Sequence, residues 1–224
     1  EGLLADRDFI LAAVEEDGLV LQFASEELRA DRRVISAAVQ QSGHALEFAS
    51  AELRDDLRTA LAALRASGAG ALKSIGPRLQ SDRRFVLQAV RLDGLALRFA
   101  SPRLRSDRAV VLAALGQSGG ALELAAEELR GDREVVLAAV EQLGRALEFA
   151  SPELQRDRDV VLAAVAQDGM VLRLAPAGFR GDREVVMSAV RQAGCALEFA
   201  DPELRGDREL ALLAVQQSGR ALAF

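Results

Sequence analysis

The sequence predicts an all-α fold, an α-solenoid of nine helical repeats of roughly 25 residues each. Three observations predict it. An aspartate recurs every 25 residues with one step of 26, an alanine follows each aspartate by seven residues, and a glycine follows it by twelve. The apolar residues between them have the spacing of a helix face, and the chain lacks strand-like alternation bounded by hairpin turns. The repeats open at Asp6, Asp31, Asp56, Asp82, Asp107, Asp132, Asp157, Asp182 and Asp207.

The longer helix of each repeat is predicted to begin directly after the aspartate. In the sixth repeat the apolar residues Val135, Val136, Ala139 and Val140 lie on one helix face. We expect Asp132 to be the N-cap, because its carboxylate can accept hydrogen bonds from the free N–H groups of the first turn, which stabilises a helix by about 1 kcal/mol. We expect the glycine to end the helix in the left-handed conformation, and the alanine to lie where a neighbouring helix approaches closely.

A shorter apolar segment follows the glycine, for example residues 145–150 (RALEFA), and we expect it to form a second, brief helix that depends on its neighbours. A serine cap with proline at the first helical position then predicts a new helical start. We expect a single 3-10-like turn there, leading to the next aspartate. This signature occurs at Ser101/Pro102 and Ser151/Pro152, with Asp201/Pro202 as a variant.

The repeats are expected to share one hydrophobic core, because a unit of 25 residues cannot bury its own apolar face. We therefore predict that residues 1–224 form a single α-solenoid domain. The chain begins part-way through a repeat and stops inside the second helix of the ninth, with no polar capping repeat at either end. From this we expect a longer polypeptide, or a partner at both ends.

An arginine follows the aspartate in eight of the nine repeats, as at Arg133 and Arg158. We expect it to pair with an acid of the adjoining repeat. We call this series of ion pairs between neighbouring repeats the cross-repeat ladder and interpret it as a structural feature. Exposed pairs of this kind contribute only about 0 to 1 kcal/mol each.

The repeat unit D-R-[E/D]-V-V-L-A-A-V-x-Q-x-G-x-A-L-E-F-A, as in residues 132–150 and 157–175, resembles a family of short tandem helical repeats known only as a domain of unknown function. Repeats of this family occur in algae, other protists and some intracellular bacteria, and no catalytic residues are attached to them. The likeness covers essentially the whole chain, and the third repeat departs most. It implies the helical fold and adds little about activity.

The composition indicates a soluble intracellular protein, in the cytoplasm or in an organelle lumen or stroma. Half of the residues are apolar, and they are mainly Ala, Leu and Val with no Trp or Tyr, which suits close helix packing better than an aromatic-lined pocket. A single cysteine excludes an internal disulfide. No uncharged apolar stretch approaches the roughly 20 residues that span a bilayer, and the first residues do not resemble a signal peptide.

Residues that could carry chemistry are few. His44 is the single histidine, without a second ligand nearby, and we expect an ordinary surface residue. Cys195 occupies a variable loop position. The glycines of residues 66–76 follow a helix rather than a strand, so they do not predict a phosphate-binding loop. We expect no catalytic residues, no cofactor, no metal and no small-molecule substrate.

One region departs from the repeat in charge. The chain has a net charge of −6, yet twelve basic and five acidic residues lie between Arg54 and Arg108, and this region also contains the one-residue insertion, placed between Gly68 and Asp82. In the third repeat Leu57 replaces the arginine that follows the aspartate. The candidate basic patch for partner binding consists of Arg58, Arg65, Lys73, Arg78, Arg84, Arg91, Arg98 and Arg103.

Two interpretations of this patch stay open. It can be a docking surface for an acidic partner, attractive over about 8 Å at physiological salt. It can also be compositional drift, since 27 of the 28 basic residues are arginine.

The sequence favours a non-catalytic protein–protein interaction scaffold. The alternative is a structural linker that bridges subunits of a large complex. Such a complex could be associated with an organelle or a membrane. Binding of nucleic acid or anionic lipid through the basic middle repeats is a minor alternative. We expect protein partners with an acidic surface, and contact with a membrane only through a complex or the basic patch.

Overall fold

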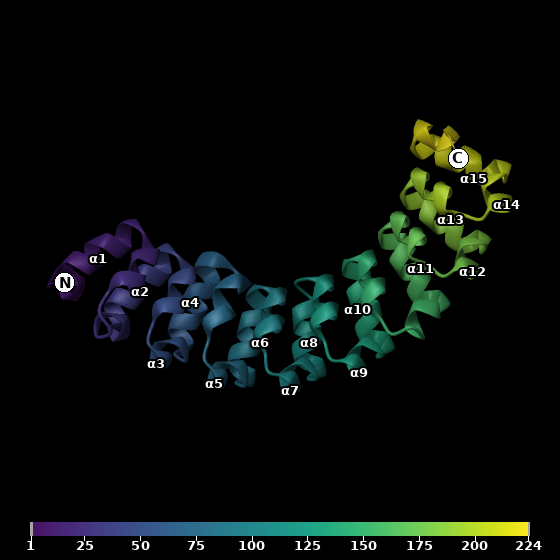
Figure 1. The fold of residues 1–224 in the computed structure, drawn as a ribbon. Helices are drawn as coiled ribbons and strands as arrows, with labels where there is room; N and C mark the ends of the chain where they lie inside the picture. The colour runs from purple at the N-terminus through teal and green to yellow at the C-terminus, as the bar shows by residue number, and fades with distance from the viewer. Residues whose placement is uncertain (1, 224) are drawn as a thin grey trace. The chain divides into compact units, whose positions relative to one another are not determined.

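The computed structural model describes residues 2–223, and within them the chain is all-α. Each of the first eight repeats contains a long α-helix, a 3-10 helix and one further helical turn, in that order, and the ninth is described as far as its 3-10 helix (Figure 1). The predicted α-solenoid of tandem helical repeats is confirmed. The long helices are α1 Arg7–Glu16, α2 Arg32–Gln41, α4 Leu57–Ser67, α6 Arg83–Leu92, α8 Arg108–Leu115, α10 Arg133–Gln142, α11 Arg158–Gln167, α13 Arg183–Gln192 and α15 Arg208–Gln217.

The connecting segments are short. The 3-10 helices that follow the long helices are η2 Gly18–Phe23, η4 Gly43–Phe48, η5 Ala69–Ser74, η6 Gly94–Phe99, η7 Gly119–Leu124, η8 Gly144–Phe149, η10 Gly169–Arg173, η11 Gly194–Phe199 and η12 Gly219–Ala223. A further 3-10 helix, η1 Gly2–Ala5, precedes α1. The further turns are η3 Leu28–Ala30, α3 Ala51–Arg54, α5 Pro77–Gln80, α7 Pro102–Arg105, α9 Glu127–Arg130, η9 Leu154–Arg156, α12 Ala177–Arg180 and α14 Pro202–Arg205.

The chain divides into two compact units, Glu1–Gln117 (unit 1) and Ser118–Phe224 (unit 2). Each is described by itself below. The expectation of a single domain stays a prediction.

The two short segments differ in detail from the sequence prediction. The segment after the glycine is a 3-10 helix. The turn that precedes the next aspartate is α-helical in six places and 3-10 at η1, η3 and η9. A six-residue segment closes one more hydrogen bond when it pairs residues three apart than when it pairs residues four apart, which favours the 3-10 form in so short a helix.

The aspartates cap the long helices as predicted. Every one of the nine accepts a hydrogen bond from a backbone N–H group of the first turn. The Asp132 carboxylate, for example, accepts from Glu134 N at 3.0 Å and Val135 N at 3.2 Å. The serine caps are less regular: Ser151 Oγ accepts from Leu154 N, whereas Ser101 makes no side-chain cap bond.

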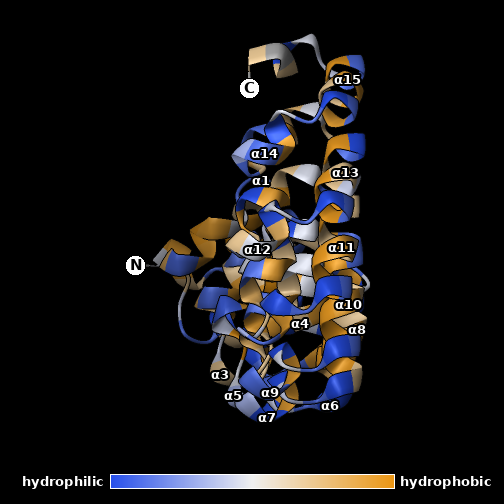
Figure 2. Ribbon diagram, turned by 90° about the vertical axis from the view of Figure 1, so that its right-hand side faces the viewer, coloured by the Kyte–Doolittle hydropathy of each residue, from blue (hydrophilic) through white to orange (hydrophobic). Residues whose placement is uncertain are grey.

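The core lies between the long helices and the 3-10 helices. Val135, Val136, Ala139 and Val140 of α10 are fully buried, as their spacing predicted. The long helices are amphipathic, with both hydrophobic and hydrophilic residues on each (Figure 2). Neighbouring long helices within a unit pack side by side. Several of them, such as α4 and α11, also contact the 3-10 helices of their own and of the preceding repeat.

The expected left-handed glycines are wrong at all but one position. Among residues 2–223 only Gly68 has a positive φ, at 68°. Six of the other repeat glycines are needed for close approach: a Cβ on Gly144 would lie 2.5 Å from Ala164 O, and one on Gly169 would lie 2.2 Å from Ala189 O. The six are Gly18, Gly43, Gly119, Gly144, Gly169 and Gly194. In these six repeats the glycine therefore packs against the backbone at the constant alanine of the next repeat.

The insertion also lies elsewhere than predicted. Helix α4 has 11 residues where its neighbours α2 and α6 have 10, so the extra residue precedes Gly68. Ala69 then begins η5, in the place that glycine has in the other repeats, and its N–H group donates to Asp93 Oδ2 at 2.7 Å. The helix absorbs the insertion because this bond holds the register of the following 3-10 helix.

Side chains of one repeat also bond to the backbone of another. Gln167 Oε1 accepts from Gly144 N at 2.7 Å, and Gln167 Nε2 donates to Gln142 O at 3.3 Å. Gln41 and Gln192 accept in the same way from Gly18 and Gly169. The glutamine of the repeat unit is thus a clamp on the preceding repeat, a role that the sequence reasoning missed.

Candidate docking surface

The eight basic residues predicted as a patch lie in unit 1, and all of them are exposed. They are distributed over three kinds of segment. Arg58 and Arg65 lie on α4 and Arg84 and Arg91 on α6; Lys73 and Arg98 lie on η5 and η6; Arg78 and Arg103 lie on α5 and α7. We call the first four, on the two neighbouring long helices, the basic helix face.

The basic helix face is a two-by-two arrangement of guanidinium groups. Arg58 and Arg65 are seven residues apart on α4, and so are Arg84 and Arg91 on α6, which places each pair two helical turns apart, about 10 Å along the axis. None of the four forms an ion pair within the described part of the chain. Their positive charges are therefore available to a partner.

Other arginines of the repeats are occupied by the predicted cross-repeat ladder. In unit 1, Arg7 pairs with Asp31 at 2.9 Å, Arg32 with Asp56 at 3.1 Å, and Arg83 with Asp107 at 2.7 Å. In unit 2 the ladder has an additional acid two residues after the aspartate: Arg133 pairs with Asp157 and Asp159, Arg158 with Asp182 and Glu184, and Arg183 with Asp207 and Glu209.

The ladder holds several N-cap carboxylates in the ionised form. The pKa of Asp107 is lowered first by the hydrogen bond from Arg83, and further by the N–H groups of Val110 and Ala109. The pKa of Asp157 is lowered mainly by the N–H group of Val160, with Arg133 contributing. These arginines and aspartates neutralise each other and are stabilising elements of the repeat.

The position two residues after the aspartate separates the two units chemically. In unit 1 it is arginine in the second, third and fourth repeats, at Arg33, Arg58 and Arg84, and Asp8 and Ala109 in the first and fifth. In unit 2 the acids Asp159, Glu184 and Glu209 at this position are each paired with the arginine of the preceding repeat. Three repeats of unit 1 thus present cations that are unpaired within residues 2–223 at the position where three repeats of unit 2 present paired acids.

The ladder is interrupted beside the basic helix face. Leu57 replaces the arginine in the third repeat and is 41% exposed, and Asp82 caps α6 without an ion-pair partner among the described residues. Leu92 at the end of α6 is 49% exposed. The surface of α4 and α6 therefore combines free guanidinium groups with accessible leucine side chains.

A groove between α2 and α4 extends this surface. It encloses a volume of about 270 Å³ and is lined by Arg32, Ser36, Val39, Asp56, Arg58, Thr59 and Ala62. Arg33, exposed on α2 and without an ion pair in residues 2–223, occupies the same position of its repeat as Arg58. The sequence analysis missed Arg33 because it lies outside the basic stretch. Its equivalence to Arg58 and Arg84, each two residues after the aspartate, could have identified it.

The remaining four predicted residues are less clearly part of one surface. Arg78 Nη2 donates to Asp55 O at 2.9 Å, so this arginine fixes α5 to the preceding repeat. Lys73, Arg98 and Arg103 are exposed on segments other than the long helices. Of the eight residues, the structure places four on the neighbouring helices α4 and α6.

The structure places the residues considered for chemistry apart from one another. His44 is exposed on η4, and Cys195 Sγ lies 3.7 Å from Ser218 Oγ. Within residues 2–223 no three His, Cys, Asp or Glu side chains are close enough to hold a metal ion, and no helix is both long and apolar enough to cross a membrane.

The fold and the exposed, unpaired arginines define an all-α tandem-repeat protein with a charged helix face. A family model described as a domain of unknown function, DUF4116, matches residues 6–54, 59–103, 82–130, 132–180 and 182–224. The chain belongs to this family, and the first match, 6–54, spans two structural repeats. No curated protein and no solved structure is detectably similar to it.

Proposed function

We propose that this protein is a non-catalytic interaction scaffold that binds an acidic protein partner through the basic helix face of unit 1. The observation that carries the proposal is the set of four exposed arginines, Arg58, Arg65, Arg84 and Arg91, on neighbouring long helices and without ion pairs among the described residues. The ladder arginines of the same unit, Arg7, Arg32 and Arg83, are each paired with an aspartate. Arginine suits such a surface because its planar guanidinium binds carboxylates through two parallel hydrogen bonds.

The repeat itself provides the comparison that supports docking over compositional drift. Drift toward arginine would place the residue on any exposed position and would leave its ion pairs unchanged. On α4 and α6 the extra arginines coincide instead with the loss of a ladder arginine at Leu57 and with a longer helix. Such a concentration of departures on neighbouring helices is expected of a binding surface.

The proposal is tested by what co-purifies with the native full-length protein. A partner with an acidic surface should be retained at low salt and lost at high salt, because salt screens the attraction between exposed charges across an interface. The double variant Arg84→Glu/Arg91→Glu should reduce retention at least tenfold. The matched control Arg145→Glu/Arg173→Glu reverses two exposed arginines of unit 2 and should retain the partner.

The other interpretations give different results in the same experiment. A linker that bridges a large complex would co-purify with several subunits, some of which would survive reversal of the basic helix face. Binding of RNA or DNA would appear in a filter-binding assay as affinity that falls steeply with salt, and binding of anionic lipid as retention on vesicles that contain phosphatidylserine. Equal retention by the two double variants would overturn the docking role of the basic helix face.

A further inference from the structure

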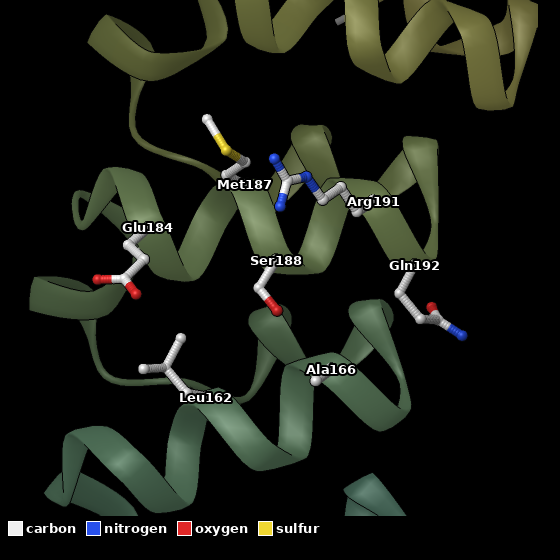
Figure 3. A pocket seen from close by; sticks show the side chains of 7 residues that line it. All are labelled: Leu162, Ala166, Glu184, Met187, Ser188, Arg191 and Gln192. Carbon is white, nitrogen blue, oxygen red and sulfur yellow. The ribbon is translucent and has the colours of Figure 1, made fainter.

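A second groove lies in unit 2, between helices α11 and α13. It encloses a volume of about 490 Å³, within the size range of about 300 to 1,000 Å³ that is typical of ligand sites. In Figure 3 the lining side chains of α11 are apolar, and those of α13 are polar apart from Met187. The lining residues are Leu162 and Ala166 of α11 and Glu184, Met187, Ser188, Arg191 and Gln192 of α13.

The tandem repeats provide an internal standard for this groove. The fifth residue after the aspartate is leucine in the other long helices of unit 2, at Leu137, Leu162 and Leu212, but methionine at Met187. The ninth residue is Glu141, Ala166 or Gln216 in those helices, but arginine at Arg191. Ser188 likewise stands where α10 and α11 have Ala138 and Ala163.

These three departures lie in one helix and line one groove. Met187 and Ser188 are only half-buried and Arg191 is exposed, so the core does not require them. Methionine is unbranched and polarisable and adapts its shape to an apolar ligand more readily than leucine does. The changes therefore fit a binding surface better than they fit packing.

The charges in the groove favour a ligand with a carboxylate. Glu184 is neutralised, because its carboxylate accepts from Arg158 Nη2 at 2.5 Å. Arg191 makes no ion pair within the described residues, and in Figure 3 its guanidinium group extends toward Met187 along the rim of the groove. Gln192 uses its oxygen to accept from Gly169 N. The uncompensated charge at the groove is thus positive and adjoins an apolar wall.

We propose that the groove between α11 and α13 binds a short peptide segment of a partner in which an aliphatic side chain is followed by aspartate or glutamate. The aliphatic side chain packs against Leu162, Ala166 and Met187, and the carboxylate pairs with Arg191. Ser188 offers a hydroxyl group to the peptide backbone. This site is separate from the basic helix face and would stand if unit 1 bound no partner.

The chain has two methionines, which makes the test specific. Protein labelled with ¹³C at the methionine methyl groups gives one NMR signal from Met187 in the groove and one from Met170, exposed on η10 outside it. The probe is the blocked peptide Gly-Leu-Leu-Asp-Asp-Gly, titrated into the full chain up to millimolar concentration. We expect a saturable shift of the Met187 signal and none of the Met170 signal.

Two control peptides and two variants separate the contributions. Replacing the aspartates of the peptide by lysine, or its leucines by serine, should each weaken the effect at least fivefold. Arg191→Gln should weaken binding about three- to tenfold, whereas Arg173→Gln, an equal loss of charge outside the groove, should not. No shift of the Met187 signal, or a shift that is the same for all peptides and for Arg191→Gln, would overturn the proposal; neither outcome bears on docking by unit 1, which Met187 does not report.

Discussion

The glycine of each repeat gives the sharpest test of how the repeats are held together. In Gly144→Ala the new Cβ would lie 2.5 Å from Ala164 O and 3.0 Å from Gln167 Oε1. Carbon and oxygen atoms normally approach no closer than about 3.3 Å, so the two repeats must separate by several tenths of an ångström. At Gly219, in the last repeat, a Cβ would meet nothing within 4 Å, and Gly219→Ala is therefore the matched control.

The expected change in the free energy of unfolding follows from two opposing effects. Overpacking costs about 1 to 3 kcal/mol, and replacement of glycine at a permitted φ stabilises by about 0.4 to 1 kcal/mol through the unfolded chain. We expect a net loss of about 1 to 2 kcal/mol for Gly144→Ala, and a neutral or slightly stabilising effect for Gly219→Ala. For a chain of this size the loss corresponds to a melting temperature lower by about 2 to 8 °C.

Thermal melts followed by circular dichroism measure both variants, and hydrogen exchange locates the change. Amides of η8 and α11 should exchange faster in Gly144→Ala, because the bond from Gly144 N to Gln167 Oε1 lengthens. Equal melting temperatures for the two variants would show that the glycine is not present for close approach. The interpretation of the glycine column as an inter-repeat contact would then be wrong.

Three further outcomes are expected, each measured by urea denaturation at equilibrium. Ala139→Leu should lose about 1 to 3 kcal/mol, because Ala139 is fully buried and a larger side chain overpacks the core; full stability would refute its placement. Gln167→Ala should lose about 1 to 2 kcal/mol through two inter-repeat hydrogen bonds, whereas the exposed Gln216→Ala should change stability little. The pKa of Asp157 is lower in the folded chain than in the unfolded chain, so its carboxylate stabilises the fold above about pH 4. This stabilisation is lost as the pH falls through the pKa of the folded state. The free energy of unfolding of Asp157→Asn should therefore fall less steeply with acid than that of the wild type.

The repeat architecture was predictable because its determinants are local. A capping aspartate and an apolar spacing act within two helical turns, so Asp132 and the face of Val135, Val136 and Val140 could be assigned without knowledge of any neighbour. The ladder was predictable as well, since stacking at a period of 25 residues brings Arg133 beside Asp157.

The glycine column shows where local reasoning was insufficient. A constant glycine has two physical causes, a left-handed backbone or the close approach of another chain segment, and both leave the same residue in the sequence. Only the position of Ala164 O beside Gly144 distinguishes them. The insertion was misplaced for a related reason, because Gly68 aligns with the other glycines in sequence while Ala69 takes their place in the structure.

Some features of the candidate sites could be predicted from the sequence, and others depend on the tertiary structure. The sequence by itself determined that the third and fourth repeats are basic and that the arginines of the long helices are exposed. Only the tertiary structure decided which cations are uncompensated, that Arg78 bonds to a backbone carbonyl, and that Met187, Ser188 and Arg191 meet residues of α11 in one groove. The reason is physical: a helical period fixes which face a residue occupies, whereas ion pairs and grooves are formed by residues about 25 positions apart, whose distances depend on how the repeats pack.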